Sequence, residues 1–267
     1  MPISRPNIAK IVALLVLGLM ALAGCAHRGG TMATLPWHAS RQLVLVTVAD
    51  WNADHGTLRA YARGVHGWVA AGIVGPVTIG KAGAGWGLGL NAPQQSGGPI
   101  KHEGDNRSPA GVFRIGDTFG YASHVDTAMP YLALNATEYC VDFSGAAHYN
   151  RIVDANVVGA DAVKGSTEPM RRDLHANGDQ RYRMGFVIEQ NPQAKAQAGS
   201  CIFAHLWQSQ TDSTAGCTAM TPSVMQSLLA WLRPEDQPVF ILLPQHEYER
   251  LRNDWQLPAI AVTGTAP

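Results

Sequence analysis

Gln42-Leu-Val-Leu-Val-Thr-Val48 is a continuous apolar run with a β-branched residue at most positions, which predicts a buried strand at the start of the folded domain. A second buried strand is predicted at residues 239–243. Short apolar pieces bounded by Gly, Pro and Asp predict further strands at residues 58–63, 68–70, 77–79, 112–115, 139–143, 185–189 and 200–205. One helix is predicted at residues 221–233, because Thr221 can cap it and Pro222 suits its first position.

These elements predict a mainly β fold of the β-rich α+β class, with sandwich-like mixed sheets and one helix packed on them after the loop that contains Cys217. Charged residues make up only 15% of the chain, and 28 Gly and 16 Pro among 267 residues favour strands and turns. The 20 Lys and Arg residues balance the 20 Asp and Glu residues, so there is no basic field to attract nucleic acid. Nucleic acid is therefore excluded as a partner.

The first 24 residues have the features of a bacterial signal peptide. A basic start precedes an apolar run at residues 11–23, which is shorter than the ~20 residues that the alternative, a transmembrane anchor, needs. Residues 22–25, Leu-Ala-Gly-Cys, resemble the lipobox of bacterial lipoproteins, which implies cleavage before Cys25 and acylation of that residue. Ala26 then implies sorting to the outer membrane, so we expect a periplasmic protein with a lipid anchor in that membrane.

The rest of the chain is predicted to hold a single domain. Residues 25–40 are small and polar, as expected of a tether between a lipid anchor and a folded domain. We assign residues 41–250 to the folded, catalytic domain and residues 251–267 to a C-terminal tail. No internal repeat is evident.

A histidine and a cysteine carry the chemistry that the sequence indicates. Residues 199–205 read Gly-Ser-Cys-Ile-Phe-Ala-His and residues 213–220 read Ser-Thr-Ala-Gly-Cys-Thr-Ala-Met, so a strand ends at His205 and a short loop leads back to Cys217. An adjacent imidazole can take the proton of a thiol and make it a nucleophile. Gly216 lets backbone N–H groups approach an oxyanion.

The bland alternatives are a buried structural cysteine at Cys217 and an ordinary histidine at His205. A zinc site that uses both is disfavoured, because the chain has no Cys-x-x-Cys or His-x-x-x-His pair. We therefore expect no metal and no cofactor.

The order His205, a short gap and Thr214-Ala-Gly-Cys217 resembles the hallmark of the YkuD-type L,D-transpeptidases, which are cell-wall enzymes of bacteria. The upstream stretch at residues 103–113, Glu-Gly-Asp-Asn-Arg-Ser-Pro-Ala-Gly-Val-Phe, resembles the Thr-Pro-x-Gly element of that family. The resemblance covers residues 75–245. It departs from the family at two positions, where many members have His in place of Ala215 and Arg in place of Ala219.

The resemblance implies an acyl transfer on peptidoglycan stem peptides. Cys217 would attack the carbonyl between meso-diaminopimelate and D-alanine, backbone N–H groups at Gly216 and Cys217 would hold the oxyanion, and His205 would protonate the leaving D-alanine. We expect Asp105 and Arg107 to form an ion pair that shapes their turn, with direct contact to the substrate as the alternative. Thr214 is a further candidate for contact with the substrate. An amine that captures the thioester makes the enzyme a transpeptidase, and water makes it a carboxypeptidase.

An amidase that releases a wall-linked protein, and a non-catalytic lipoprotein that binds peptidoglycan, remain alternatives. Lipidation would consume Cys25, so three cysteines are left in an oxidising compartment. We predict a disulfide between Cys140 and Cys201, because it braces the strand that ends at His205 and leaves Cys217 reduced. Asp142, Tyr149 and Asn150 either line the cleft or close a loop. The sequence does not indicate an oligomeric state.

Overall fold

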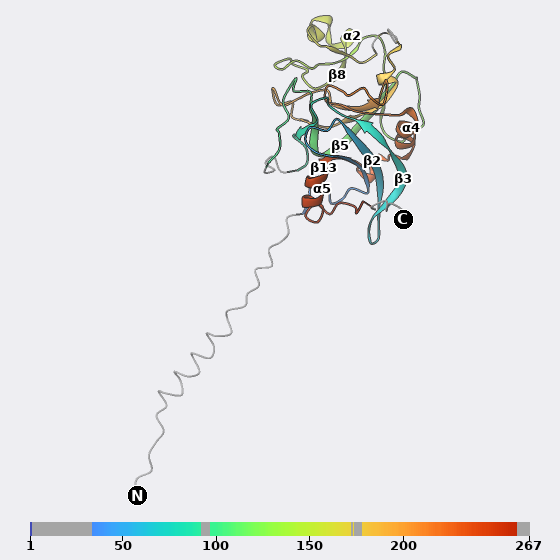
Figure 1. Ribbon diagram of the computed structural model, residues 1–267. Helices are drawn as coiled ribbons and strands as arrows, with labels where there is room; N and C mark the ends of the chain where they lie inside the picture. Colours follow the sequence, from blue (N-terminus) through green and yellow to red (C-terminus); the bar gives the residue numbers. More distant parts are fainter. Residues whose placement is uncertain (2–33, 92–96, 172, 174–177, 261–267) are drawn as a thin grey trace. The chain divides into compact units, whose positions relative to one another are not determined.

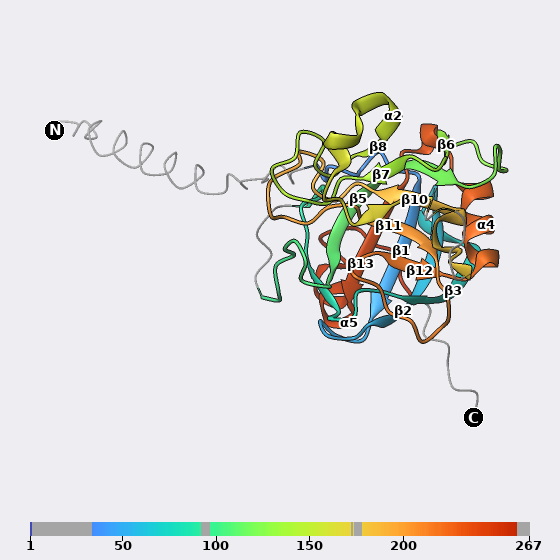
Figure 2. The same ribbon diagram turned by 90° about the horizontal axis from the view of Figure 1, so that it is seen from above.

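Eight strands form a closed, barrel-like sheet (Figure 1 and Figure 2). Around the ring they follow the order β10, β11, β12, β3, β2, β1, β13 and β5, and β5 pairs with β10 to close it. Their bounds are β1 Gln42–Val48, β2 His55–Gly64, β3 Gly67–Thr78, β5 Ser108–Gly120, β10 Met184–Ile188, β11 Phe203–Leu206, β12 Thr218–Met220 and β13 Val239–Pro244.

This computed structural model describes residues 1, 34–91, 97–171, 173 and 178–260. The predicted signal peptide, apart from Met1, and the predicted lipidation site Cys25 lie outside the described residues.

The closed ring differs from the sandwich-like arrangement expected from the sequence, and the length of β5 explains the difference. β5 spans 13 residues. Its residues 111–114 pair with β13, whereas residues 115–120 pair with β10, where the register shifts between Phe186 and Ile188. One long strand thus joins two sets of neighbours into a single ring. The fold is mainly β, as predicted, with 35% strand and 15% helix.

β1 and β13 form the centre of the core. They pair in parallel, with Leu43 opposite Val239, and β1 also pairs with β2 in antiparallel fashion. Every residue of both strands is buried, which explains why both segments are continuous apolar runs.

Two helices cover the ring. α4, Pro222–Trp231, begins where Thr221 accepts a hydrogen bond from the N–H of Val224, and it packs against β3, β10 and β11. α5, Gln245–Leu251, packs against β1 and β13 and was not predicted, because no capping side chain marks its start at Pro244. None of the helices in the described part of the chain is both long and apolar enough to cross a bilayer.

A small sheet lies at the end of the domain opposite α5, together with the short helix α2 (Figure 1). It contains β7 Glu138–Cys140, β8 Ile152–Asp154 and β9 Glu168–Pro169, and α2 spans Ala155–Val158. Two further short strands, β4 Ala84–Trp86 and β6 Tyr131–Ala133, pair with β5. Single 3-10 turns occur at η1 Ala160–Val163, η3 Arg181–Arg183 and η4 Pro234–Asp236.

Both ends of the predicted domain extend further than the sequence indicated. Trp37, assigned to the tether, is only 3% exposed and packs edge-on against Trp255 with ring centroids 5.4 Å apart. Leu251, Trp255 and Leu257, assigned to the tail, are buried in the same core. The contact between Trp37 and Trp255 explains why both ends belong to the domain, because each indole ring is buried against the other. The compact unit begins at Leu35, and its described part ends at residue 260.

Candidate active site

The parallel pairing of β11 with β12 brings His205 and Cys217 together. His205 lies opposite Ala219 in the register, and Cys217 immediately precedes β12. Side chains two residues apart on a strand share a face, so Cys217 and Ala219 lie on one face of this pair. His205 and Cys217 line the same cavity, which has a volume of about 180 Å³. The structure thus places the two predicted catalytic side chains at one site.

The orientation of His205 is held by its own strand and by an aromatic neighbour. The residue is 4% exposed, and Nδ1 lies 2.8 Å from the carbonyl oxygen of Leu206. A carbonyl only accepts, so Nδ1 carries the proton and Nε2 carries the lone pair in the neutral ring. The ring of Tyr182 packs edge-on against the imidazole, with centroids 5.5 Å apart. The base that this tautomer offers is therefore Nε2.

The thiol of Cys217 belongs to a half-buried residue and is neutral at rest. Its sulfur accepts a hydrogen bond from the N–H of Phe203 at 3.3 Å, and its S–H points to the carbonyl oxygen of Cys201 at 3.5 Å. Burial raises the pKa of the thiol to about 12, and the negative charge of Glu168 acts in the same direction. The N–H of Phe203 and the positive charges of Lys101 and Arg181 oppose this rise in pKa. A base is therefore needed to form the thiolate.

A tight turn fixes the backbone around Cys217. The hydroxyl of Thr214 donates to the carbonyl oxygen of Cys217 at 2.7 Å and accepts from the N–H of Gly216 at 3.1 Å. The hydroxyl of Ser108 donates to the same carbonyl oxygen at 2.9 Å. Thr214, expected to bind substrate, thus builds the turn, although it also lines the cavity. For Gly216 to serve an oxyanion, its N–H must leave the Thr214 hydroxyl.

Gly216 adopts a conformation that other residues avoid. Its φ is +154°, and a Cβ atom there would lie 3.1 Å from the carbonyl oxygen of Arg107 and 3.3 Å from a methyl group of Ile202. The backbone of the upstream element thus lies directly against the turn before the nucleophile.

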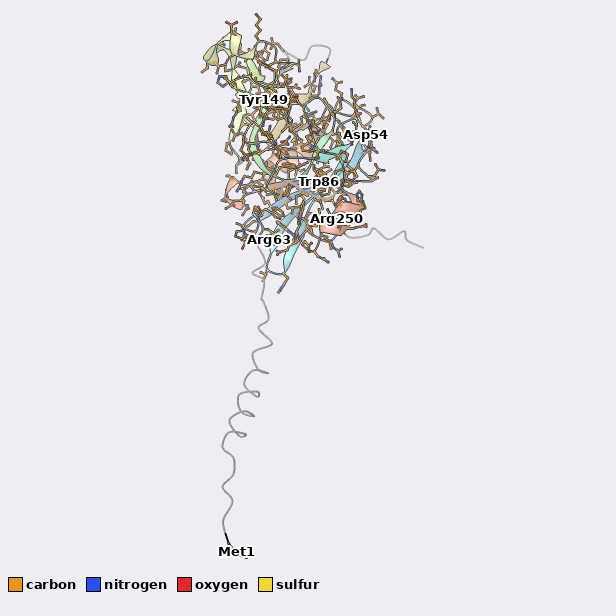
Figure 3. All side chains as sticks on the ribbon, turned by 90° about the vertical axis from the view of Figure 1, so that its left-hand side faces the viewer. Met1, Asp54, Arg63, Trp86, Tyr149 and Arg250 are labelled. Atoms are coloured by element: carbon orange, nitrogen blue, oxygen red, sulfur yellow. A yellow bond between two sulfur atoms is a disulfide. The ribbon has the colours of Figure 1, made fainter. Side chains whose placement is uncertain are left out.

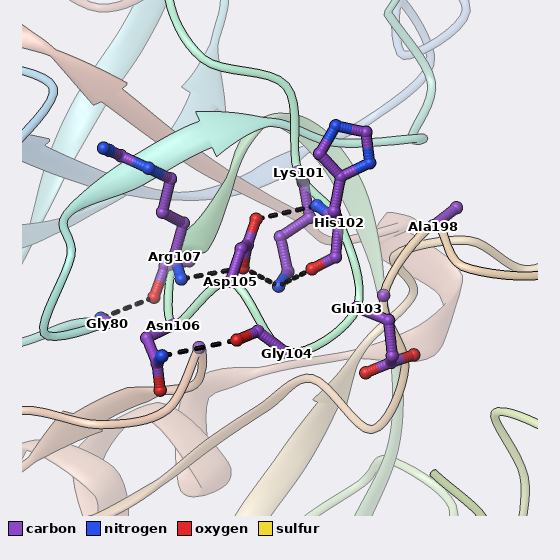
Figure 4. A network of polar contacts seen from close by, with 12 residues as sticks. Gly80, Lys101, His102, Glu103, Gly104, Asp105, Asn106, Arg107 and Ala198 are labelled. Carbon is purple, nitrogen blue, oxygen red and sulfur yellow. Dashed lines mark hydrogen bonds and ion pairs between the residues drawn. The ribbon is translucent and has the colours of Figure 1, made fainter. Parts of the chain in front are cut away.

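Asp105 organises the loop before β5 rather than facing the cavity (Figure 4). Its carboxylate accepts hydrogen bonds from the ammonium of Lys101, from the N–H of His102 at 2.7 Å and from the N–H of Arg107 at 2.9 Å. Lys101 is buried, and Asp105 is the carboxylate that compensates its charge.

The side chain of Arg107 also makes its hydrogen bonds within the protein. Its guanidinium points away from Asp105 in Figure 4, and it donates to the carbonyl oxygens of Trp51 at 2.8 Å and Ala84 at 2.9 Å. The expected ion pair between the side chains of Asp105 and Arg107 is not formed, because Lys101 takes the carboxylate and backbone carbonyls take the guanidinium. Neither residue lines the cavity that holds His205 and Cys217.

Three charged residues that line the cavity, Glu168, Arg181 and Asp212, escaped the sequence analysis. Glu168 of β9 and Arg181 of η3 line it together with His205 and Cys217. Arg181 forms an ion pair with Asp179 at 2.6 Å, and Glu168 accepts a hydrogen bond from the hydroxyl of Tyr182 at 2.6 Å. No local motif marks any of these residues. One indirect signal was available. Ala219 lines the same cavity and stands where many members of the resembled family have an arginine, so a positive charge had to come from another part of the chain.

A second cavity reaches Cys217 from another side. It has a volume of about 290 Å³ and is lined by residues that include Lys101, Glu103 and Ser200. Ala215, Cys217 and Glu168 line both cavities. Cys217 thus borders both cavities.

A disulfide ties the small sheet to the segment before β11. Cys140 of β7 and Cys201 are bonded, with Cα atoms 5.9 Å apart, and Cys217 is the free cysteine of the described residues. Asn150 accepts a hydrogen bond from the N–H of Cys201 at 2.9 Å and donates to the carbonyl oxygen of Asn191 at 2.8 Å. The disulfide and the asparagine together hold the carbonyl that receives the thiol proton of Cys217.

Two other residues near this disulfide close loops, and one of them, Asp142, also lines the second cavity. The hydroxyl of Tyr149 donates to the carboxylate of Glu103, and Asp142 accepts from the N–H of Thr167 at 2.9 Å.

Comparisons with known proteins identify no relative of this chain. No protein-family model matches the chain, and the searches of curated proteins and of solved structures find no significant match. Within the described ranges, no three His, Cys, Asp or Glu side chains are grouped so that they could hold a metal ion. The function is therefore argued from the site.

Proposed function

We propose that this protein is a cysteine acyltransferase that acts on peptidoglycan stem peptides by L,D-transpeptidation. The observation that carries the proposal is that His205 and Cys217 line one cavity, while the hydrogen bond of Nδ1 leaves Nε2 as the nitrogen of His205 that can act as a base. The resemblance of residues 205–217 to the YkuD-type motif supplies the substrate class. An acylated Cys25 would hold the enzyme in the periplasm at the outer membrane, where these peptides lie.

Acylation uses the two side chains in turn. Nε2 of His205 takes the proton of the Cys217 thiol, and the thiolate attacks the carbonyl carbon that precedes D-alanine. The C–S bond forms, and the carbonyl electron pair moves to the oxygen. When that pair returns, the C–N bond breaks, and the proton on Nε2 passes to the leaving amine of D-alanine. The products are a thioester on Cys217 and free D-alanine.

The second half needs an amine acceptor, and the two cavities support this step. An acceptor amine attacks the thioester carbon, the C–N bond forms, and the C–S bond breaks. The amine loses its proton to His205, which returns it to the thiolate. Because Cys217 lines both cavities, the acceptor can reach the thioester while the acyl group occupies the other cavity. Water in place of the amine gives L,D-carboxypeptidase products.

The charges of the cavity fit a stem peptide, which carries both carboxylates and ammonium groups. Arg181 supplies the positive charge that Ala219 lacks, so it is the proposed partner for a substrate carboxylate. Glu168, which lines both cavities, supplies a negative charge for an ammonium group. These residues take the place of Asp105 and Arg107 as proposed substrate contacts.

The test is the mass of the intact protein after incubation with a synthetic stem tetrapeptide that ends in D-alanine. We expect a tripeptide adduct on Cys217, release of D-alanine, and transfer of the adduct when an amine acceptor is added. Cys217→Ala should form no adduct. Release of D-alanine without transfer would identify a carboxypeptidase. Absence of both, with binding to insoluble peptidoglycan, would identify a wall-binding lipoprotein.

A further inference from the structure

The turn between β2 and β3 exposes apolar side chains. Val65 at the turn is 95% exposed, and Val69 and Val74 along β3 are 60% and 58% exposed. Trp68 lies between the two ends of this stretch and is only partly buried. Single exposed apolar residues are ordinary, whereas this hairpin exposes three valines.

The same hairpin is positively charged. No Asp or Glu occurs between His55 and His102, whereas Arg59 and Arg63 both lie in β2. The guanidinium of Arg63 lies 4.1 Å from the centre of the Trp68 ring. The indole N–H of Trp68 donates to the carbonyl oxygen of Gln256 at 2.9 Å, and Nε of Arg63 donates to the carbonyl oxygen of Ser40 at 3.4 Å, so the two side chains are held in place beside the exposed valines. Tryptophan and arginine are residues that proteins place at membrane interfaces.

The hairpin turn lies at the end of the ring where the chain enters it. The N–H of Arg63 donates to the carbonyl oxygen of Arg41 at 2.7 Å, and Gln42 pairs with Ala62. Figure 3 shows Arg63 at the end of the domain opposite Tyr149, whose hydroxyl contacts a residue of the second cavity. The apolar turn and the two cavities thus occupy different ends of the domain.

The length of the tether limits how far this end can lie from a lipid anchor. The chain has ten residues from Cys25 to Leu35, where the compact unit begins, and ten residues extend at most about 36 Å. A lipid on Cys25 would therefore keep the entry end of the ring close to the bilayer.

We propose that the β2–β3 turn rests on an anionic phospholipid surface, with Val65 and Trp68 at the interface and Arg63 at the phosphate groups. This proposal rests on the lipid attachment in the proposed function. The contact would orient the domain so that the cavities beside Cys217 face away from the membrane, toward the peptidoglycan.

The test uses the chain from Ala26 onward, without the lipid, because the unit from Leu35 contains the whole core. Its partition onto vesicles of phosphatidylglycerol and phosphatidylethanolamine is measured by sedimentation. We expect Val65→Asp to lower the partition coefficient by about tenfold, which is the scale of burying one valine. Arg63→Gln should lower it on these vesicles and not on neutral phosphatidylcholine.

Val157→Asp is the matched control, since Val157 is 81% exposed on α2 at the other end of the domain, and it should partition like the wild type. Equal partition of Val65→Asp and the wild type, or no partition of the wild type, overturns the membrane contact. Release of D-alanine from a soluble stem peptide separates this proposal from the first. A protein that binds vesicles but releases no D-alanine supports the membrane contact and contradicts the proposed enzyme activity. A protein that releases D-alanine but does not bind vesicles supports the enzyme activity and contradicts the membrane contact.

Discussion

The imidazole of His205 donates from Nδ1 to the carbonyl oxygen of Leu206, its own neighbour in β11, at 2.8 Å. In many enzymes a carboxylate holds the catalytic imidazole in this way. Here a backbone carbonyl sets the tautomer, so the strand that carries the histidine also orients it.

His205→Ala should slow acylation of Cys217 by a factor of roughly 10²–10⁴, the usual contribution of a positioned base. The residual rate should rise with pH, because hydroxide then removes the thiol proton that the imidazole no longer takes. The adduct on the intact protein, followed by mass spectrometry between pH 6 and 10, measures both effects. His66→Ala, at the exposed turn after β2, should acylate like the wild type. A His205→Ala rate that is lower but independent of pH would contradict a base role.

The resting thiol should react slowly with iodoacetamide. With its pKa raised to about 12 by burial, Cys217 holds far less thiolate at pH 7.5 than a free cysteine of pKa about 8.5. We expect alkylation more than about a hundredfold slower in the folded protein than in urea, and a rate that climbs up to at least pH 10. Glu168→Gln should speed alkylation at fixed pH, because it removes a charge that raises the pKa of the thiol. Fast alkylation that is constant from pH 6 to 8 would instead indicate a thiolate–imidazolium pair.

The parts of the fold that follow from local pattern were the parts that the sequence predicted. β1 and β13 are buried throughout, so their apolar runs stand out, and Thr221 with Pro222 marks the start of α4. Ring closure depends on residues 115–120 of β5 meeting β10, a pairing between distant segments that no local pattern encodes. The buried tail escaped for the same reason, since its partner Trp37 lies at the other end of the chain.

The site divides in the same way. His205 and Cys217 could be selected because His205 lies near the end of β11, Cys217 immediately precedes β12, and the small residues Ala215 and Gly216 come directly before the cysteine. Glu168 and Arg181 come from the small sheet and the turn before β10, and only the folded chain brings them to the cavity. Asp105 was misread as a partner of the Arg107 side chain, because nothing in the sequence showed that Lys101 is buried beside it.

Gly216→Ala should impair the site more than the fold. The new methyl group meets the carbonyl oxygen of Arg107 at 3.1 Å and forces the turn before Cys217 to shift. We expect at least a tenfold loss in the acylation rate and a stability cost of about 1–2 kcal/mol from the positive φ. Gly72→Ala is the control, since Gly72 has a φ of +80° with nothing within 4 Å of the new atom. Unfolding in urea and the acylation rate are measured on both variants. Both should lose stability from backbone strain, whereas only Gly216→Ala, which displaces the turn before Cys217, should lose acylation.

Arg181→Gln should weaken substrate binding. The change removes the positive charge proposed to meet a substrate carboxylate, so KM for the stem peptide should rise about tenfold or more while kcat changes less. Arg183→Gln, two residues further in the same turn and exposed, is the matched control and should leave KM unchanged. A variant that loses kcat with KM intact would assign Arg181 to the chemical step instead. Because Asp179 loses its ion pair with Arg181, unfolding should be checked for both variants.

The double variant Cys140→Ser with Cys201→Ser should lower both stability and activity. The disulfide closes a sequence separation of 61 residues, and the loss of such a link costs about 2–4 kcal/mol of unfolding free energy. Activity should fall further than stability explains, since the carbonyl of Cys201 accepts the thiol proton and the bridge holds it in place. The comparison is Asn150→Ala, which removes the other hold on Cys201 and leaves the disulfide intact. If acylation at 15 °C, where the double variant remains folded by circular dichroism, matches the wild type, the bridge serves stability alone. If acylation is slower in both variants, the disulfide also positions the thiol of Cys217.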